Sequence, residues 1–332
     1  MQNYKIDAKR LEKIPATARN PASTGKLPFQ IDIPENREDS TGEAINAKEE
    51  IQIFTDGSAI NGKVGAATLL MRPGKPTSML HYHLGWVSKH TVHEAELTGI
   101  LLAVCLVETE KRGHSSIVIG CNNQAAIWAF QTKLRNPGQH LMWEILRSAN
   151  KLVKKGKKNK YSLTIRWTAR HEGIAGNELA NQEAKKAADS LSSEKLTLLR
   201  YLRKPLLINP SAVKQDYDAR LKKAWTNEWR NLERGRKMLE IDNSTPSNKF
   251  IKLISNPDLS CNAASTIAQI RITHMPLNSY LKCYKRTGRS RCPVCRVESE
   301  SISHFLLVCP TYAHKRWLLH RQARKKKKPL TL

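Results

Sequence analysis

The stretch IQIFTDGS at residues 51–58 decides the fold of this chain. Its β-branched residues at 51, 53 and 55 alternate with Gln52 and Phe54, which is the pattern of a β-strand. We expect the strand to end at Asp56, where Gly57 and Ser58 let the chain turn away. A carboxylate at a strand end, followed by small residues, is suited to hold a cation or to polarise a water molecule.

The hydrophobic pattern predicts four more strands, with helices between them. Strands at 64–71 and 80–87 are expected to form an antiparallel meander with the first strand. Apolar residues then recur at helical spacing from 92 to about 111. The elements expected next are a strand at 116–120, helices at 125–130 and 141–154, a strand at 161–167 and a helix ending near 191. The order βββαβαβα predicts an α/β fold, with a mixed five-stranded sheet and flanking helices.

Two glutamates of the helix from residue 92 are expected to have different surroundings. Glu96 lies on the apolar stripe, where an unpaired carboxylate is costly unless a cation receives it. Glu94, two residues earlier, points elsewhere on the helix and is expected at the surface. Glu96 therefore joins Asp56 as a candidate ligand for a metal ion.

The composition favours a polyanionic partner. The chain has 332 residues, enough for about two domains, and a formal net charge of +27. Such an excess points to nucleic acid, although a basic protein without such a partner is the alternative. No apolar run is long enough to cross a membrane. The N-terminus lacks the apolar core of a secretory signal, and seven scattered cysteines fit a reducing compartment, so we expect an intracellular protein of the nucleus or cytoplasm.

Four motifs along residues 48–190 resemble the type 1 ribonuclease H domain. They are TDGS at 55–58, AEL at 95–97, NNQAAI at 122–127 and the pattern W-x-x-x-H-x-G-I-x-G-N-E-x-A-x-x-x-A-K at 167–185. The version is similar to the one carried by the polyproteins of non-LTR (LINE-type) retrotransposons, especially fungal ones. The resemblance implies a ribonuclease H-like fold that acts on RNA–DNA hybrids and hydrolyses the RNA strand with two Mg²⁺ or Mn²⁺ ions.

The resemblance also implies roles for five residues. Asp56 and Glu96 match the first two metal-binding acids of the family. Asn122 and Asn181 stand at the third and fourth positions, where the family has Asp. His171 matches the histidine that assists proton movement and product release.

The two asparagines predict a weakened metal site. Four carboxylates would offer a charge of −4 to two dications, whereas two offer −2, and an amide supplies only one suitable oxygen. We therefore expect weak metal binding and impaired catalysis. Both replacements, and Arg170 at a position usually held by glycine, are reachable by G-to-A changes. This suggests a decayed element copy without a selected role, and the alternative is a non-catalytic nucleic-acid-binding protein.

A second metal site is predicted near the C-terminus. Cys292, Cys295, His304 and Cys309 form the spacing C-x2-C-x8-H-x4-C, which is typical of a structural Zn²⁺ site. The surrounding sequence is similar to the zinc knuckle that follows ribonuclease H in these retrotransposons, where the knuckle engages nucleic acid, including RNA. The four cysteines outside the pattern are expected to be ordinary thiols; they are Cys105, Cys121, Cys261 and Cys283.

These patterns divide the chain into five segments. Their expected bounds are a disordered leader or linker at 1–45, a ribonuclease H-like domain at 46–191, a basic helical connector at 192–260, a helical segment with the zinc knuckle at 261–320 and a basic tail at 321–332. In the connector, Trp225, Trp229 and Leu232 share a helix face and are expected in a core. The tail is either a nuclear-localisation or phosphate-binding run or simply a solvated terminus.

Overall fold

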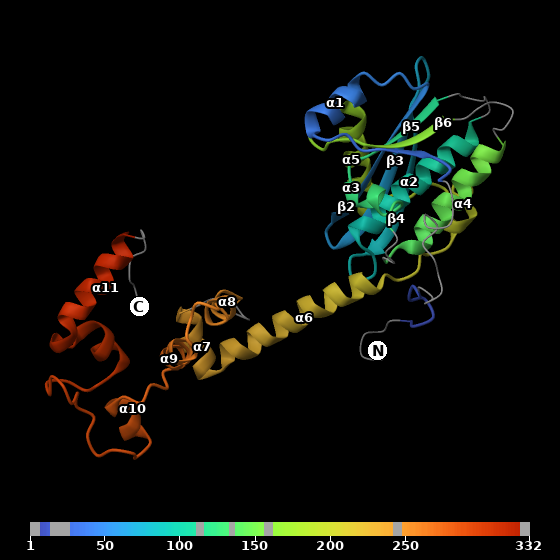
Figure 1. Cartoon of the computed structure of the whole chain (residues 1–332). Helices are drawn as coiled ribbons and strands as arrows, with labels where there is room; N and C mark the ends of the chain where they lie inside the picture. Colours follow the sequence, from blue (N-terminus) through green and yellow to red (C-terminus); the bar gives the residue numbers. More distant parts are fainter. Residues whose placement is uncertain are drawn as a thin grey trace. The chain divides into compact units, whose positions relative to one another are not determined.

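The computed structural model divides into two compact units (Figure 1). Unit 1 comprises Met1–Asp218 and unit 2 comprises Ala219–Leu332. The residues that the structure describes are 7–13, 27–110, 116–132, 137–155, 162–241 and 248–325. Most of the expected basic tail therefore lies outside the described residues.

Unit 1 is built on a mixed six-stranded sheet with the order β1-β6-β5-β2-β3-β4. The strands are β1 (Gln30–Asp32), β2 (Ile51–Ile60), β3 (Lys63–Met71), β4 (Ser78–Trp86), β5 (Ser116–Cys121) and β6 (Ser162–Trp167). Strands β2, β3 and β4 form the expected antiparallel meander, while β1, β6, β5 and β2 pair in parallel. The expected mixed α/β class is confirmed.

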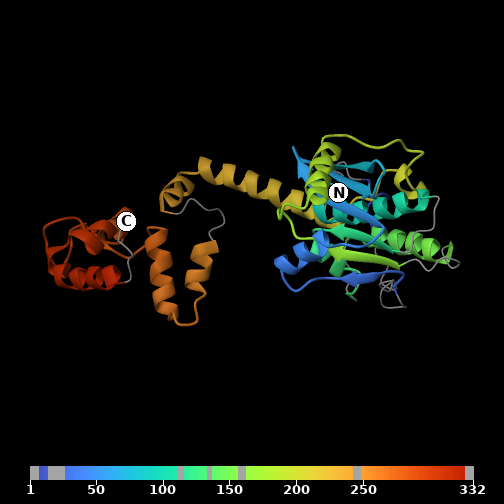
Figure 2. The same ribbon diagram turned by 90° about the horizontal axis from the view of Figure 1, so that it is seen from above.

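Helices cover both faces of this sheet (Figures 1 and 2). The helices of unit 1 are α1 (Arg37–Ile45), α2 (Val92–Thr109), α3 (Gln124–Trp128), α4 (Gln139–Lys155), α5 (Ala175–Ala188) and the 3₁₀ helix η4 (Arg200–Arg203). Successive residues of β2 point to opposite faces. Gly57 abuts Ala95 of α2, and Phe54 abuts Gly176 of α5, so these two helices lie on opposite faces. The larger apolar core lies between the sheet and the α2–α4 layer.

The sheet has six strands rather than the expected five, because β1 comes from the predicted leader. β1 pairs in parallel with β6, and Phe29 before it is buried against Phe130. Ser40 of α1 is fully buried as well. The predicted leader is therefore wrong for residues 27–45: a three-residue strand and a polar nine-residue helix are too short to give a sustained hydrophobic period.

Unit 1 also extends beyond residue 191, where a boundary was expected. Leu198, Leu202 and Leu206 are buried in the same core as the sheet residues. Near the N-terminus, Leu11 bridges to Ile208, and Ile208 donates a backbone hydrogen bond to Arg10. The segment after α5 thus belongs to this core rather than to a connector.

Unit 2 is helical, as expected, but has very little core. α6 (Pro210–Asn231) enters it from unit 1, and its further helices are α7 (Glu233–Ile241), α8 (Asn248–Ile254), α9 (Cys261–Arg271), α10 (Asn278–Cys283), η5 (His304–Val308), η6 (Pro310–Tyr312) and α11 (Ala313–Lys325). α8 and α9 lie side by side (Figure 2). Trp225 and Leu232 are each 49 % exposed, and Trp229 is partly exposed, so the prediction that they form a core is wrong.

Among the described helices, none is both long enough and apolar enough to cross a membrane.

Candidate functional site

Parallel pairing of β2 with β5 brings Asp56 beside Asn122. The two strands pair until Thr55 lies opposite Cys121, and the next residue on each is one of the two site residues. Asn122 Nδ2 donates a hydrogen bond of 2.5 Å to Asp56 Oδ1. We expected the strand to end at Asp56, but β2 continues to Ile60, because it stays paired with β3. Asp56 therefore lies level with the end of β5, the parallel partner of β2, and not at the end of β2 itself.

Glu96 reaches the same point because α2 packs very closely on β2. A Cβ atom on Gly57 would lie 2.6 Å from the Glu96 backbone nitrogen, so only glycine permits this approach. Both carboxylates are buried, with Asp56 at 0 % and Glu96 at 3 % exposure. Burial raises the pKa of Asp56 above its usual value, and burial together with the nearby Asp56 charge raises the pKa of Glu96 further. The site thus holds two buried carboxyl groups whose negative charge the surrounding protein compensates poorly.

Asn181, the predicted fourth ligand position, lies on α5, which follows the loop after β6. Asn181 is partly exposed, and its Oδ1 accepts a hydrogen bond of 3.3 Å from Arg170 Nη2. His171 follows in the same loop, with an exposed side chain and a left-handed φ of 63°. It makes no hydrogen bond to Asp56, Glu96 or the asparagines among the described contacts.

Asn123 and Lys185 also belong to this site, although the sequence analysis did not single them out. The Asn123 side chain lowers the pKa of Glu96, and the charge of Lys185 lowers the pKa of Asp56, but burial outweighs both effects. Asn123 is the second residue of the NNQAAI motif, and Lys185 is the last residue of the motif at 167–185, so membership of these motifs was the available signal.

The residues present fit one divalent ion better than two. Asp56 Oδ2 is buried without a hydrogen-bond partner, which suits a cation. Asp56 Oδ1, however, already accepts the Asn122 amide, and the Asn181 oxygen is engaged by Arg170. Mg²⁺ prefers several oxygen ligands including carboxylates. A two-metal centre, as the family resemblance implies, does not fit this set of donors.

The prediction that Glu94 lies at the surface is wrong, because α4 covers the side of α2 that faces away from the sheet. Glu94 is fully buried and accepts hydrogen bonds from the Thr91 backbone and hydroxyl groups in a capping box. His90 Nδ1 and His140 Nε2 each lie 3.8 Å from its Oε1. These surroundings lower the pKa of Glu94 despite the opposing effect of burial. Glu94 is part of the interface between helices, not of the Asp56 site.

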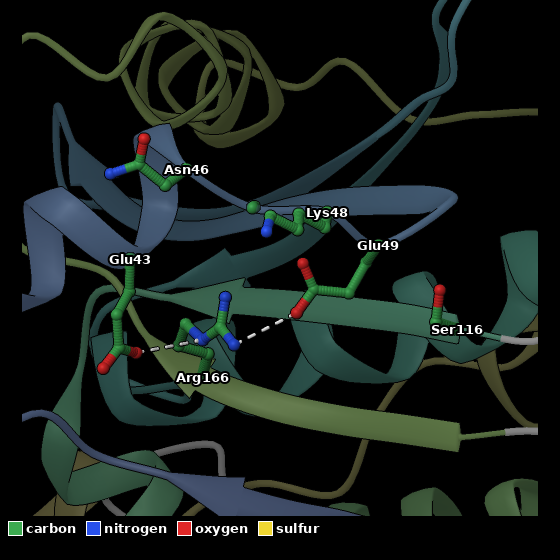
Figure 3. A pocket seen from close by; sticks show the side chains of 7 residues that line it. Glu43, Asn46, Lys48, Glu49, Ser116 and Arg166 are labelled. Carbon is green, nitrogen blue, oxygen red and sulfur yellow. Dashed lines mark ion pairs between the residues drawn. The ribbon is translucent and has the colours of Figure 1, made fainter.

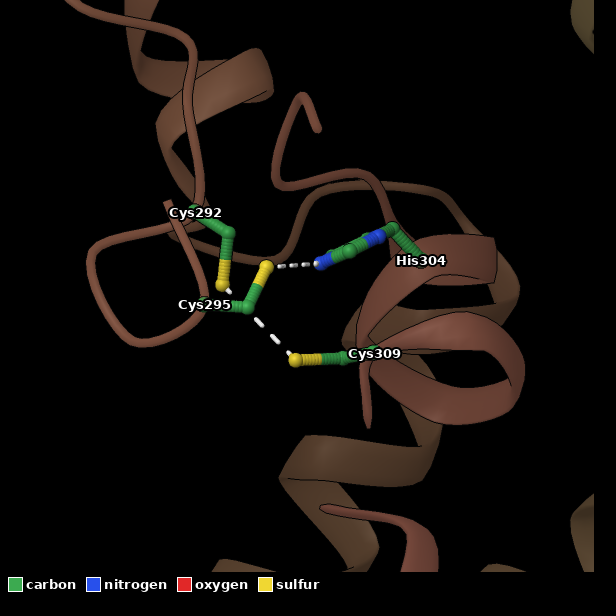
Figure 4. Close-up of side chains that lie close together, drawn as sticks. All are labelled: Cys292, Cys295, His304 and Cys309. Carbon is green, nitrogen blue, oxygen red and sulfur yellow. Dashed lines mark hydrogen bonds between the residues drawn. The ribbon is translucent and has the colours of Figure 1, made fainter. Parts of the chain in front are cut away.

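Unit 2 brings the four predicted zinc ligands together (Figure 4). Their ligand atoms all lie within 4.8 Å of one another, with 4.0 Å between the Cys292 and Cys309 sulfurs and 3.3 Å between Cys295 Sγ and His304 Nε2. A tetrahedral zinc ion would hold two thiolates about 3.8 Å apart. This cysteine cluster, as we call the four residues, could therefore hold Zn²⁺ with little movement.

The surroundings of the cysteine cluster support metal binding. Backbone N–H groups of the turn lower the pKa of Cys292 and of Cys295, which favours the thiolate form that binds metal. His304 Nδ1 lies 3.1 Å from Glu298 Oε2, which leaves Nε2 to face the cysteines. Such a carboxylate–histidine pair orients a zinc ligand. Of the remaining thiols, Cys105 and Cys121 are buried, and Cys261 and Cys283 are exposed.

An open pocket of about 390 Å³ lies elsewhere on unit 1 (Figure 3). Its most prominent charge, Arg166, is paired with Asp32 at 2.7 Å, Glu49 at 3.0 Å and Glu43 at 3.4 Å. None of the four ligand positions lines it. Three carboxylates already engage the guanidinium group of Arg166, and these ion pairs hold β1 and α1 to β6. The pocket is therefore not an anion site.

Comparisons with known proteins give likenesses in structure only. The N-terminal RNase H domain of a Mycobacterium tuberculosis protein is 14 % identical, with a TM-score of 0.31, over 42 % of this chain and 98 % of that one. RNase H1 from Halobacterium salinarum is 15 % identical, with a TM-score of 0.32 and the same coverage. LC11-RNase H1, solved in complex with an RNA/DNA hybrid, is 17 % identical, with a TM-score of 0.30, over 41 % of this chain and 98 % of that one. No protein-family model and no curated protein matches the sequence.

Proposed function

We propose that unit 1 is a ribonuclease H-type domain, derived from a non-LTR retrotransposon, that binds RNA–DNA hybrids and has lost most of its capacity to cleave them. The observation that carries this proposal is the hydrogen bond from the Asn122 amide to Asp56 Oδ1. In this bond a protein N–H group, rather than a cation, lies against the Asp56 carboxylate. Mg²⁺ or Mn²⁺ would bind through Asp56 and Glu96, and Zn²⁺ would occupy the cysteine cluster.

Cleavage of a labelled RNA–DNA hybrid by the full chain in Mg²⁺ or Mn²⁺ tests this proposal. The comparison is with the Asn122→Asp, Asn181→Asp double variant, which restores the charge of the site to that of four carboxylates. We expect little turnover by the wild type and clear turnover by the double variant. Asp56→Asn in the double variant should abolish it, since it removes a carboxylate whose Oδ2 is buried without a hydrogen-bond partner.

Two outcomes would contradict the proposal. Cleavage by the wild type that Asp56→Asn abolishes would make the protein a working ribonuclease. A silent double variant that also fails to bind hybrid would remove the assignment to this class of nuclease.

A second candidate function is non-catalytic nucleic-acid binding by unit 2, in the nucleus or cytoplasm. Unit 2 carries 24 Lys and Arg residues against 7 Asp and Glu, whereas unit 1 carries 32 against 22. Polyanion binding by such a unit should weaken steeply as salt is raised. A fluorescence titration of single-stranded RNA at two salt concentrations would separate this function from that of an inert fold.

A further inference from the structure

Protein N–H donors already occupy two of the four ligand positions of the Asp56 site. Arg170 Nη2 donates to Asn181 Oδ1 at 3.3 Å, and Asn122 Nδ2 donates to Asp56 Oδ1. In a site built for metal ions these oxygens would face cations. Here they face a guanidinium group and an amide, so both oxygens already accept hydrogen bonds from the protein.

Arg170 is placed to act on both carboxylates as well as on the amide. Its charge favours the ionised forms of Asp56 and Glu96, lowering the pKa of each against the larger effect of burial. It extends from the short loop between β6 and α5, and Thr168 and Ala169 of that loop are buried. The guanidinium is therefore held near the site by a fixed backbone and yet stays open to solvent.

We propose that Arg170 is the resident cation of this site: it excludes a divalent ion from the Asn181 side and offers its guanidinium group to a backbone phosphate of the bound nucleic acid. A guanidinium group is always charged and presents several donors in one plane, which matches phosphate geometry without any metal ion. One donor is used by Asn181, and the others remain for a ligand. The phosphate contact rests on the proposed function, whereas the exclusion of metal does not.

Direct measurement of Mn²⁺ binding tests the exclusion without nucleic acid. The full chain is first loaded with Zn²⁺, because the soft thiolates of the cysteine cluster then keep zinc while Mn²⁺ seeks oxygen ligands. Isothermal titration calorimetry should show weak Mn²⁺ binding by the wild type and binding about tenfold tighter by Arg170→Gln, since a nearby positive charge is removed. Arg170→Lys should retain the exclusion.

Arg200→Gln is the matched control. Arg200 is exposed on unit 1, and its replacement removes the same charge at another position. It should leave Mn²⁺ affinity unchanged. Equal Mn²⁺ affinity in the wild type and Arg170→Gln would overturn the proposal, as would a wild type that binds Mn²⁺ as tightly as the Asn122→Asp, Asn181→Asp double variant.

Hybrid affinity tests the phosphate contact. The wild type should bind an RNA–DNA hybrid without magnesium, and Mg²⁺ added at constant ionic strength, with zinc retained, should not tighten the Kd. Arg170→Gln should weaken binding by about tenfold, against a much smaller loss for Arg200→Gln. A Kd that requires Mg²⁺, or equal losses in the two variants, would overturn this half. If no hybrid binds at all, the proposed function and the phosphate contact both fail, and the Mn²⁺ titration still decides the exclusion.

Discussion

The two metal-ligand clusters of this chain differ in what surrounds them. The Asp56 site combines two carboxylates with two asparagines, and Asp56 Oδ1 and Asn181 Oδ1 accept hydrogen bonds from protein donors. Unit 1 nevertheless has an extensive apolar core. The cysteine cluster keeps all four ligands, but in the described part of unit 2 the only buried apolar or sulfur-containing side chains are Leu277 and the ligands Cys292 and Cys309.

The two predicted metal sites would therefore use an ion in different ways. Where the ion does chemistry, the fold stands without it, so its ligands can be lost without unfolding the protein. Where the ion replaces a core, the loss of any one ligand removes the fold. We therefore expect variants of the two clusters to affect different properties: activity and ion binding in unit 1, and folding in unit 2.

The largest expected effect is the loss of unit 2 when zinc is removed. Structural zinc contributes about 10–16 kcal/mol of apparent folding free energy in small domains. Chelation, or Cys309→Ser, should therefore abolish the dispersed amide NMR signals of unit 2 and leave those of unit 1 in place. Cys283→Ser, an exposed thiol on α10, is the control and should change neither. A folded unit 2 in zinc-free Cys309→Ser protein would show that zinc does not take the place of a core there.

The next effect concerns Glu94, a buried carboxylate between α2 and α4. Glu94→Gln should lower the free energy of unfolding by about 1.5–3 kcal/mol, because it replaces the charged acceptor of the Thr91 hydrogen bonds by a neutral amide in a buried site. Glu108→Gln, at an exposed position on the same helix, is the control and should change it by less than about 0.5 kcal/mol. Urea denaturation of both variants measures the difference.

The effect of Glu94→Gln on the free energy of unfolding should depend on pH, in a direction set by the shift in the pKa of Glu94. The pKa of Glu94 is lower in the folded state than its usual value of 4.5. Its carboxylate therefore stabilises the fold above pH 4.5, and this contribution is lost as the pH falls through the folded-state pKa. The gap between wild type and Glu94→Gln should narrow below pH 4.5, and a constant gap down to pH 3 would contradict the assignment.

The sequence predicted what depends on local spacing and missed what depends on distant packing. The cysteine cluster follows from four residues within one short segment, and the meander from alternation within each strand. Glu94 was misplaced because no local pattern shows that α4 covers the far side of α2. β1 was missed for a similar reason, since three residues become a strand only through pairing with β6. The positions of Asp56 and Asn122 came from the motif, but their hydrogen bond depends on the register of β2 against β5.

A smaller effect is expected at Ser40, which ties α1 to the loop of the Asp56 site. Ser40 Oγ donates to the Trp167 carbonyl and accepts from the Ala169 backbone nitrogen, both at 2.9 Å. Ser40→Ala leaves two buried backbone groups unsatisfied and should cost about 1–3 kcal/mol in urea denaturation. Thr41→Ala removes a hydroxyl group that bonds only within α1 and should cost less. Equal losses in the two variants would show that the protein does not hold this loop through Ser40.

The smallest expected effect has the opposite sign and returns to the Asp56 site. Burial and the Asp56 charge raise the folded-state pKa of Glu96, so its ionised form destabilises the fold as the pH rises through that pKa. Glu96→Gln should therefore stabilise unit 1 at pH 7 by about 1 kcal/mol, and the gain should disappear below pH 4.5, where the carboxyl group is protonated in both states. Thermal unfolding at the two pH values measures it. The gain should be larger in an Arg170→Gln background, where the opposing positive charge is gone. If Glu96→Gln instead destabilises unit 1 at pH 7, the protein already compensates the charge of this carboxylate. The contrast between a poorly compensated Asp56 site and a cysteine cluster with all four ligands would then not hold.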